Sequence, residues 1–175
     1  MQSRRTIRTV TAFLTIFVIS ISASSCFSVK YSATGATPPG NTYSVQYVEN
    51  QARLVEPGLS QLFTTEIKDY IQSNSNLKMV NGTGDNDFEV IVTGYDPSTP
   101  STIVAGDEAS QNKFTITVKV RYTCNVNPDL DFESNFSRSE TYSVSAGFES
   151  VKADLTEKII DLLLEDIYKR AFVNW

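Results

Sequence analysis

The sequence predicts an α+β protein: a two-layer sandwich with two helices on one face of a mixed, mostly antiparallel four-stranded sheet. Residues 57–72 and 151–173 carry apolar residues three and four positions apart, the spacing of an amphipathic helix. Residues 113–124 alternate strictly between apolar and polar, as in a strand with one buried face. The elements follow in the order strand, helix, strands, helix, so the later strands would form an antiparallel meander.

The first 25 residues have the three parts of a secretory signal peptide. Arg4, Arg5 and Arg8 form a basic region, residues 10–21 are mostly apolar, and small residues lead to Cys26. The apolar run is too short to span ~30 Å of hydrocarbon comfortably. We therefore expect the rest of the chain to act outside the cytoplasm.

The end of this segment, Ala23-Ser-Ser-Cys26, has two interpretations. A general signal peptidase would cut near the small residues and leave Cys26 as an ordinary residue. Alternatively, the four residues form a bacterial lipobox and Cys26 receives a lipid, which fits its position after the apolar run, although Ala23 stands where a larger aliphatic residue is usual. At about 0.8 kcal/mol per buried CH₂, two or three acyl chains would hold the protein on a membrane.

The lipobox interpretation divides the chain into three parts. Residues 1–25 would be the signal peptide, and residues 26–41 the lipidated cysteine and a tether rich in Ser, Thr, Gly and Pro. Residues 42–175 would form a single α+β domain of ordinary size. Phe27, not an acidic residue, follows Cys26, which by analogy with bacterial sorting rules permits delivery to the outer membrane.

The domain is expected to begin with a strand at residues 42–48. Tyr43, Val45 and Tyr47 would share its apolar face, with polar residues between them. The first helix follows, with Pro57 at its first position, where a missing N–H costs nothing. Its apolar stripe is Leu59, Leu62, Phe63, Ile67, Tyr70 and Ile71.

The second predicted strand covers residues 88–95. Both of its faces carry apolar side chains, so it is expected inside the sheet and not at an edge. Pro97 and Pro100 are expected to end it, because proline cannot donate to a strand ladder. The chain to Asn112 would be a loop with at most a short strand at residues 102–104.

The remaining elements have clear periodicity. The strand at residues 113–124 would bury Phe114, Ile116, Val118, Val120, Tyr122 and Cys124 and expose Lys113, Thr115, Thr117, Lys119, Arg121 and Thr123. A more polar strand covers residues 132–144. The final helix would bury Val151, Leu155, Ile159, Leu162, Leu163, Ile167, Ala171 and Phe172.

Composition excludes several classes of function. Without the three arginines of the signal segment, the chain carries 12 basic and 20 acidic residues, a net charge of −8, which argues against a nucleic-acid partner. The sequence contains no histidine, which removes Ser-His-Asp and Cys-His catalysis and the common zinc sites. We expect no catalytic residues, no metal and no cofactor beyond a covalent lipid on Cys26.

Three local patterns have a chemical interpretation. Oxygen-bearing side chains at alternate positions of residues 125–133 suggest calcium, but Leu130 stands where an EF-type loop needs glycine, so a solvated turn is favoured. Cys124 is either a buried lone thiol or one half of an intermolecular disulfide. Lys113, Lys119 and Arg121 share one strand face and would suit phosphates or an acidic partner, or would simply be a solvated sheet surface.

Several stretches together resemble the LptE family of lipopolysaccharide-assembly lipoproteins, in its Bacteroidetes-type form. They are Thr34-Gly-Ala-Thr-Pro-Pro-Gly40, Leu54-Val-Glu-Pro-Gly-Leu-Ser-Gln-Leu-Phe63, Phe88-Glu-Val-Ile-Val-Thr-Gly-Tyr95, Asn112-Lys-Phe-Thr-Ile-Thr-Val-Lys-Val120 and Glu165-Asp-Ile-Tyr-Lys-Arg-Ala-Phe-Val-Asn-Trp175. The resemblance covers nearly the whole mature chain. None of these stretches is a catalytic signature, so it depends on their order and coverage.

The resemblance implies a non-enzymatic outer-membrane lipoprotein on the periplasmic face, lipid-anchored at Cys26. Its partner would be an LptD-type outer-membrane β-barrel, which it supports in assembly and plugs, and it would bind lipopolysaccharide. The anionic ligand would favour Lys113, Lys119 and Arg121. The alternative is another periplasmic lipoprotein adaptor, such as a cell-wall synthase activator or a secretion-complex module.

Overall fold

The computed structural model describes residues 38–100 and 111–173. The predicted signal peptide, Cys26, most of the tether and the short strand at residues 102–104 lie outside these residues. The elements are β1 (Thr42–Val45), β2 (Glu49–Asn50), α2 (Leu59–Asn74), β3 (Lys78–Met79), β4 (Asn86–Pro100), β5 (Gln111–Cys124), β6 (Phe132–Ser143) and α3 (Phe148–Phe172), with short 3₁₀ helices at Pro128–Leu130 and Val144–Ala146. Neither described helix is long and apolar enough to cross a membrane.

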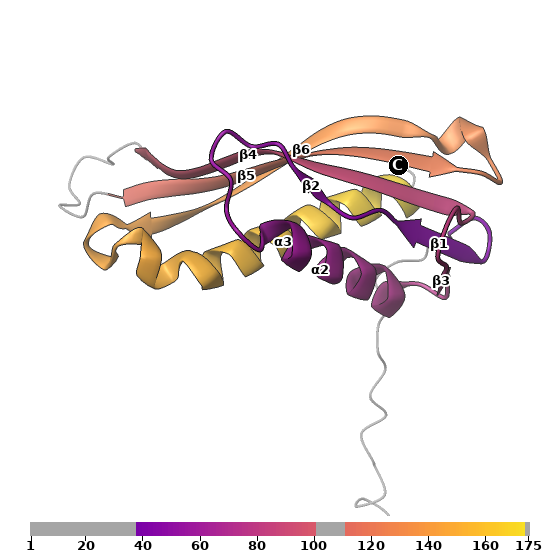
Figure 1. Ribbon diagram of the computed structural model, residues 1–175, viewed down its shortest axis with the longest axis horizontal. Helices are drawn as coiled ribbons and strands as arrows, with labels where there is room; N and C mark the ends of the chain where they lie inside the picture. Colours follow the sequence, from indigo (N-terminus) through magenta and orange to yellow (C-terminus); the bar gives the residue numbers. More distant parts are fainter. Residues whose placement is uncertain (1–37, 101–110, 174–175) are drawn as a thin grey trace, which may run out of the picture. The chain divides into compact units, whose positions relative to one another are not determined.

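The two layers are those expected from the sequence. Strands lie in the order β3-β1-β4-β5-β6, and both α2 and α3 cover the same face of the sheet (Figure 1). The meander β4-β5-β6 is antiparallel, whereas β1 and β2 pair with β4 in parallel. The predicted fold class is therefore confirmed, as is the interior position of β4 between the β1/β2 pair and β5.

The sheet has six strands, not the predicted four. Val45 of β1 pairs with Phe88, and Glu49 of β2 pairs with Ile91 farther along the same side of β4. β1 is thus the first part of the predicted strand at residues 42–48, β2 begins just after its predicted end, and the two residues of β3 add a short edge beside β1.

The first predicted strand breaks because its period fails after Val45. Tyr47, expected on the buried face, is 61% exposed, and the neighbouring Val48 is fully buried instead. The Val48 N–H donates to Thr64 Oγ1 at 3.0 Å, so it is withdrawn from the ladder with β4. Bonding to the helix layer thus replaces strand pairing at this point.

The predicted end of β4 at the prolines is wrong. Pro97 and Pro100 lie within β4, which pairs with β5 as far as Asn112. The pairing of β4 with β2 ends at Val92, so the later part of β4 has a free edge, where proline removes no ladder bond. A register shift between Asp96 and Thr99 accommodates the change.

Both helices are displaced slightly from their predicted ends. α2 begins at Leu59, after Gly58, whose φ of 81° suits glycine, so Pro57 lies outside the helix. α3 begins at Phe148, three residues before the predicted start. Most of the predicted stripes are buried, but Leu62 is 39% exposed.

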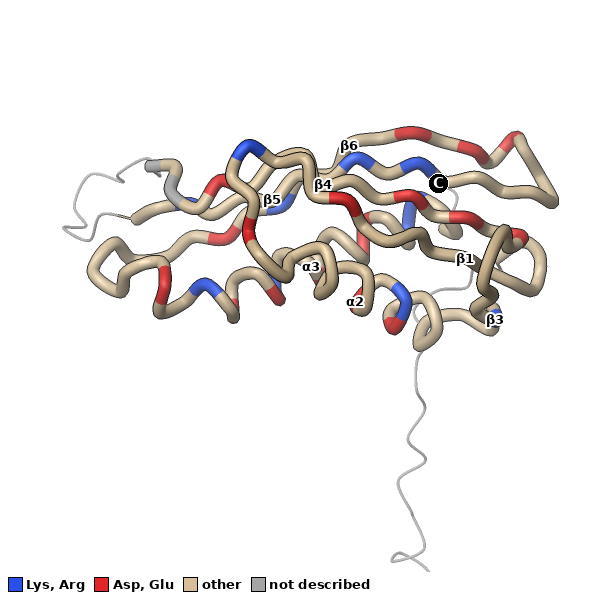
Figure 2. Tube along the Cα trace, viewed as in Figure 1, with Lys and Arg blue, Asp and Glu red and all other residues tan. Residues whose placement is uncertain are grey.

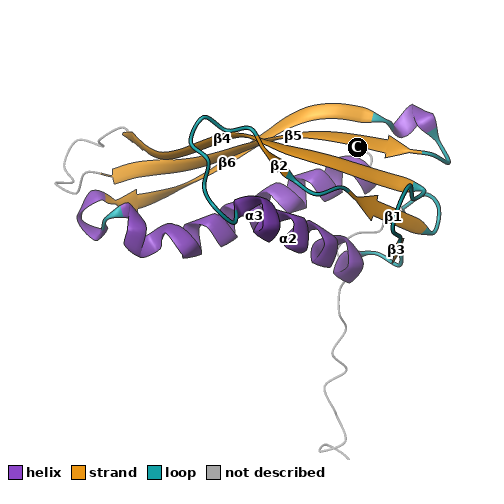
Figure 3. Cartoon of the chain, viewed as in Figure 1, coloured by secondary structure: helices purple, strands orange, loops and turns teal. Residues whose placement is uncertain are grey.

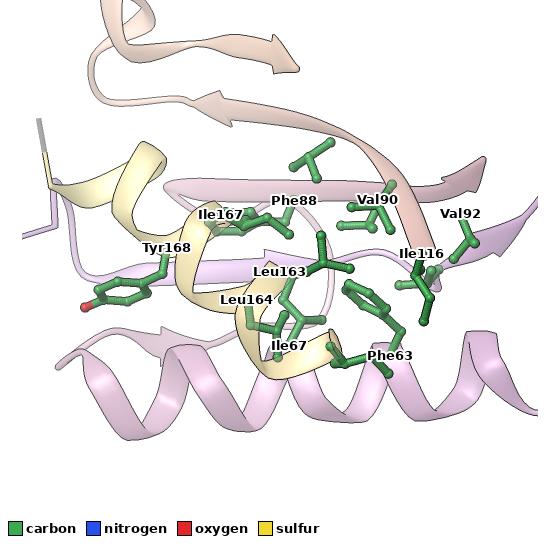
Figure 4. Packing of buried hydrophobic residues seen from close by; sticks show 14 of the residues in the cluster. Phe63, Ile67, Phe88, Val90, Val92, Ile116, Leu163, Leu164, Ile167 and Tyr168 are labelled. Atoms are coloured by element: carbon green, nitrogen blue, oxygen red, sulfur yellow. The ribbon is translucent and has the colours of Figure 1, made fainter. Parts of the chain in front are cut away.

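The core lies between the helix layer and the sheet. Figure 4 shows Phe63 and Ile67 of α2 and Leu163 and Ile167 of α3 beneath side chains of the central strands, among them Ile116. Every predicted inward residue of β5 is completely buried, including the free thiol of Cys124. Burial of such apolar side chains stabilises the fold by about 1.5–3 kcal/mol each.

A buried polar group connects β5 to the start of the domain. The Tyr122 hydroxyl donates to Asn86 Oδ1 at 2.6 Å, and Asn86 Nδ2 donates to the carbonyls of Pro39 and Thr42 at 2.7 and 3.0 Å. Burial raises the pKa of Tyr122, so its hydroxyl remains a donor at neutral pH. The chain entering β1 is thus held by hydrogen bonds that start inside the core.

Tyr122→Phe should lower the free energy of unfolding by about 1–3 kcal/mol, because Asn86 Oδ1 would remain buried without a donor. Urea unfolding followed by circular dichroism measures the change. Tyr47→Phe is the matched control, since its exposed hydroxyl forms no hydrogen bond within the described residues, and it should change stability by less than about 0.5 kcal/mol. Equal effects of the two substitutions would contradict the role of the buried bond.

Candidate functional site

The first candidate surface is the sheet face opposite the helices. Figure 3 shows both helices on one side of the sheet, so neither described helix covers the other side of β4, β5 and β6. The uncovered face presents Glu89, Ile91 and Thr93 of β4, Lys113, Thr115, Thr117, Lys119, Arg121 and Thr123 of β5, and Glu133, Asn135, Ser137, Ser139 and Thr141 of β6. The predicted cationic, hydroxyl-rich face of β5 is therefore present.

Two of its three predicted cations are paired. Lys119 Nζ lies 2.7 Å from Glu133, and Arg121 contacts Glu89 at 2.8 Å and Glu133 at 3.2 Å. The four side chains form a charge-balanced cluster across β4, β5 and β6, and Figure 2 shows basic and acidic positions interspersed along these strands. The cations and carboxylates of this cluster therefore neutralise one another in the protein without a ligand.

The third cation, Lys113, lies apart from the other two. It pairs in register with Thr99 on β4 and Thr141 on β6, and it forms no ion pair within the described residues. Lys113 lies six positions before Lys119 on β5, which corresponds to about 20 Å along the strand. The three cations therefore share one face without converging on one point.

The predicted turn after β5 is held by a hydrogen bond to the end of that strand. Asp131 Oδ1 accepts the Cys124 N–H at 2.7 Å, and a 3₁₀ helix at Pro128–Leu130 fills the segment. Within residues 38–100 and 111–173, no group of three His, Cys, Asp or Glu side chains is arranged to hold a metal ion.

A second candidate surface, which periodicity did not reveal, lies where α2 meets α3. A pocket of about 510 Å³ opens between the first turns of α2 and the first half of α3, with Leu59 and Leu62 facing Ala153 and Thr156. Glu66 and Glu157 line it as well. Helical periodicity describes each helix separately, and it cannot show which residues of the two helices meet. Only the packing of α2 against α3 brings these residues together.

A smaller pocket of about 390 Å³ lies by β1 and β3 and is mainly polar, with Ser44, Lys68 and Asp87 among its lining residues. Ser44 is already satisfied there, since its hydroxyl donates to Asp87 at 2.6 Å and accepts the Gly84 N–H at 2.9 Å. This pocket offers no unpaired buried group.

Comparisons with known proteins agree with the fold. A family model described as "LptE: Lipopolysaccharide-assembly" matches residues 40–171, about three quarters of the chain. No curated protein matches. The similar solved structures include the hypothetical protein CT253 of Chlamydia trachomatis, at 9% identity and a TM-score of 0.51, covering 77% of this chain and 99% of that one.

A second solved structure is the rare lipoprotein B of Shewanella oneidensis. It is 15% identical with a TM-score of 0.46, and the match covers 72% of this chain and 94% of that one. At such identities the Chlamydia protein supports the fold alone, and the lower score of the Shewanella protein carries no argument.

Glu133→Gln should reduce the loss of stability below pH 4.5. Hydrogen bonds from Lys119 and Arg121 hold the pKa of Glu133 below its ordinary value of 4.5. A group with a lowered folded pKa contributes stability that is present above its unfolded pKa and is lost as pH falls through the folded pKa. Thermal unfolding of both proteins from pH 7 to pH 3 measures the difference.

Asp129→Asn is the matched control, because this carboxylate forms no ion pair within the described residues. A Glu133→Gln profile that parallels that of the unmodified protein at all pH values would contradict the pairing.

Proposed function

Because the chain belongs to the LptE family of lipopolysaccharide-assembly proteins, we propose that it is the lipoprotein partner of an LptD-type outer-membrane β-barrel. In this role it supports assembly of the barrel, plugs its lumen and binds lipopolysaccharide during transfer to the outer leaflet. The observation that carries the proposal is the family match, which extends from residue 40 to residue 171 and so includes the sheet and both helices.

The protein acts by binding, without a catalytic step. The absence of histidine from the sequence removes the usual proton shuttle. Its surfaces instead suit contact with a large ligand, since one face of a long three-stranded meander is open to a partner.

A lipid on Cys26 anchors the chain at the periplasmic face of the outer membrane. Residues 26–41 are rich in Ser, Thr, Gly and Pro and act as the tether between anchor and domain. The described chain begins at residue 38, within the last part of this tether, and Asn86 holds Pro39 and Thr42 from within the core. The lipid therefore only has to keep the domain near its membrane partner.

Lipopolysaccharide contacts the uncovered face of β5 through Lys113, Lys119 and Arg121. Lys113 is available directly, because it forms no ion pair within the described residues. Lys119 and Arg121 would have to exchange Glu133 and Glu89 for phosphate groups of the ligand. Phosphate is a bidentate partner for Arg121, and neighbouring threonine hydroxyls can donate further hydrogen bonds.

Depletion of the protein should impair folding of the LptD-type barrel and reduce surface lipopolysaccharide, and the mature domain should co-purify with that barrel from detergent-solubilised envelope. A Cys26→Ser protein should lose palmitate label and restore depleted cells poorly. Unchanged barrel folding and surface lipopolysaccharide on depletion would refute the proposal. Co-purification of a cell-wall synthase instead would favour the alternative adaptor role.

Lys113→Ala should weaken lipopolysaccharide binding about three- to tenfold, because it removes an unpaired cation. Arg121→Ala should weaken binding less, because its cation already satisfies two carboxylates. Surface plasmon resonance against purified lipopolysaccharide measures both, with Lys158→Ala on the outer side of α3 as the control. Full affinity in a Lys113→Ala, Lys119→Ala, Arg121→Ala triple variant would remove β5 from the binding site.

A further inference from the structure

The contact between α2 and α3 creates a surface that the proposed function does not use. The two helices lie side by side in the same direction: residues from the first turns of both line the 510 Å³ pocket, and the rings of Tyr70 and Tyr168 meet near their other ends at 5.7 Å. Glu66 and Asp69 of α2 and Glu157 and Asp161 of α3 lie between these two points, and we call these four residues the acidic seam.

No basic side chain of the described residues forms an ion pair with the acidic seam. Burial, followed by the charges of Asp161, Asp69 and Glu157, raises the pKa of Glu66. Several other described carboxylates, such as Asp129 and Glu140, are unpaired as well, but the carboxylates of the seam are close enough to act on one another. Like charges at this spacing destabilise the free protein, so the arrangement favours a cationic partner.

The seam continues into the apolar pocket. Glu66 and Glu157 belong to both, and the apolar part of the pocket wall is formed by Pro57, Leu59, Leu62 and Ala153. The one cation of the lining, Lys152, is paired with Glu56 and Glu149. Leu62 belongs to the apolar stripe of α2, yet it is 39% exposed and faces the pocket opening. An occupant would therefore place an apolar group next to positive charge.

A buried hydroxyl lies next to Thr156, one of the residues that line the pocket. Tyr95 of β4 is only 3% exposed, and its hydroxyl forms no hydrogen bond of normal geometry with a described residue, although Thr156 is close enough to affect its pKa. Thr156 donates its own proton to the Lys152 carbonyl at 2.7 Å. Burial raises the pKa of Tyr95 to about 12, with Glu56 and Lys152, two lining residues, also acting on it.

The seam suits several separated positive charges better than one ion. Its carboxylates are close enough to repel one another, but they do not converge into a metal-holding group within the described residues. Glu157 and Asp161 are one helical turn apart, about 6 Å along α3. Basic side chains on a polypeptide match such spacing, and their neighbours can supply the apolar group.

We propose that the pocket and the acidic seam bind a basic amphipathic segment of a protein partner. One of its apolar side chains enters between Leu59, Leu62 and Ala153, and its Lys or Arg side chains lie along the four carboxylates. Lipopolysaccharide, an anionic ligand, is repelled from this side. The helix layer is thus a protein-binding side, and the inference does not depend on the uncovered sheet face being the lipopolysaccharide site.

The test uses the full chain in a nonionic detergent and a fluorescent helical peptide of about 14 residues, four turns, with leucine and lysine on one face. The unmodified protein should bind the peptide. The triple variant Glu66→Gln, Glu157→Gln, Asp161→Asn should weaken binding at least about tenfold, and Leu62→Ser should weaken it as well.

The matched control is Asp129→Asn, Glu140→Gln, Asp154→Asn, which removes the same number of carboxylates elsewhere and should leave the affinity within about twofold. The seam variant should melt at the same temperature as the unmodified protein or higher, because repulsion is relieved. If the seam variant is as stable as the unmodified protein or more so, yet binds the peptide less tightly, its loss of binding is not caused by misfolding.

Three outcomes overturn the proposal. Equal weakening of binding by the two triple variants would show that net charge alone attracts the peptide. A peptide with serine in place of each leucine that binds as tightly would remove the pocket from the site. Displacement of the peptide by Mg²⁺, but not by KCl of equal ionic strength, would make the seam a cation site instead.

Discussion

The burial of one face of β5 is the interaction on which the rest of the structure depends. Its six inward side chains, from Phe114 to Cys124, are completely buried between the helix layer and the neighbouring strands. Since the side-chain period of a strand is two, a shift of one residue would bring Lys119 and Arg121 into the core. The core therefore fixes which face of the sheet is left open, and with it the position of every charge on that face.

The same core also determines the character of the helix side. α2 lies by β1, β2 and β3 and α3 lies by β5 and β6, so the two helices meet side by side over the core, part of which Figure 4 shows. Their outward residues then meet at a seam where Glu66, Glu157 and Asp161 come together. A register shift between Val92 and Gly94 turns Tyr95 inward, toward the helix layer. The two sides of the molecule thus differ in charge balance: the sheet face pairs its carboxylates with cations, whereas the seam does not.

Much of the fold follows from periodicity, and the misses have local causes. The strand at residues 113–124 was predicted almost to its ends, because alternation over twelve residues permits one arrangement. The first strand was predicted too long, since its alternation cannot show that the Val48 N–H bonds to Thr64 of α2. Proline would end a strand that is paired on both sides, yet the prolines of β4 lie where β4 has no second partner among the described residues, so no ladder bond is lost.

The sequence by itself determined the two helices, the meander, the buried face of β5 and the resemblance to the LptE family. All of these follow from the order and spacing of residues along the chain, so they can be predicted without knowing which distant residues are in contact. Only the tertiary structure decided that Arg121 meets Glu89, 32 residues away, and that α2 and α3 join their carboxylates into one seam. Charge pairing and charge crowding depend on distances between separate elements, and a linear pattern contains no information about those distances.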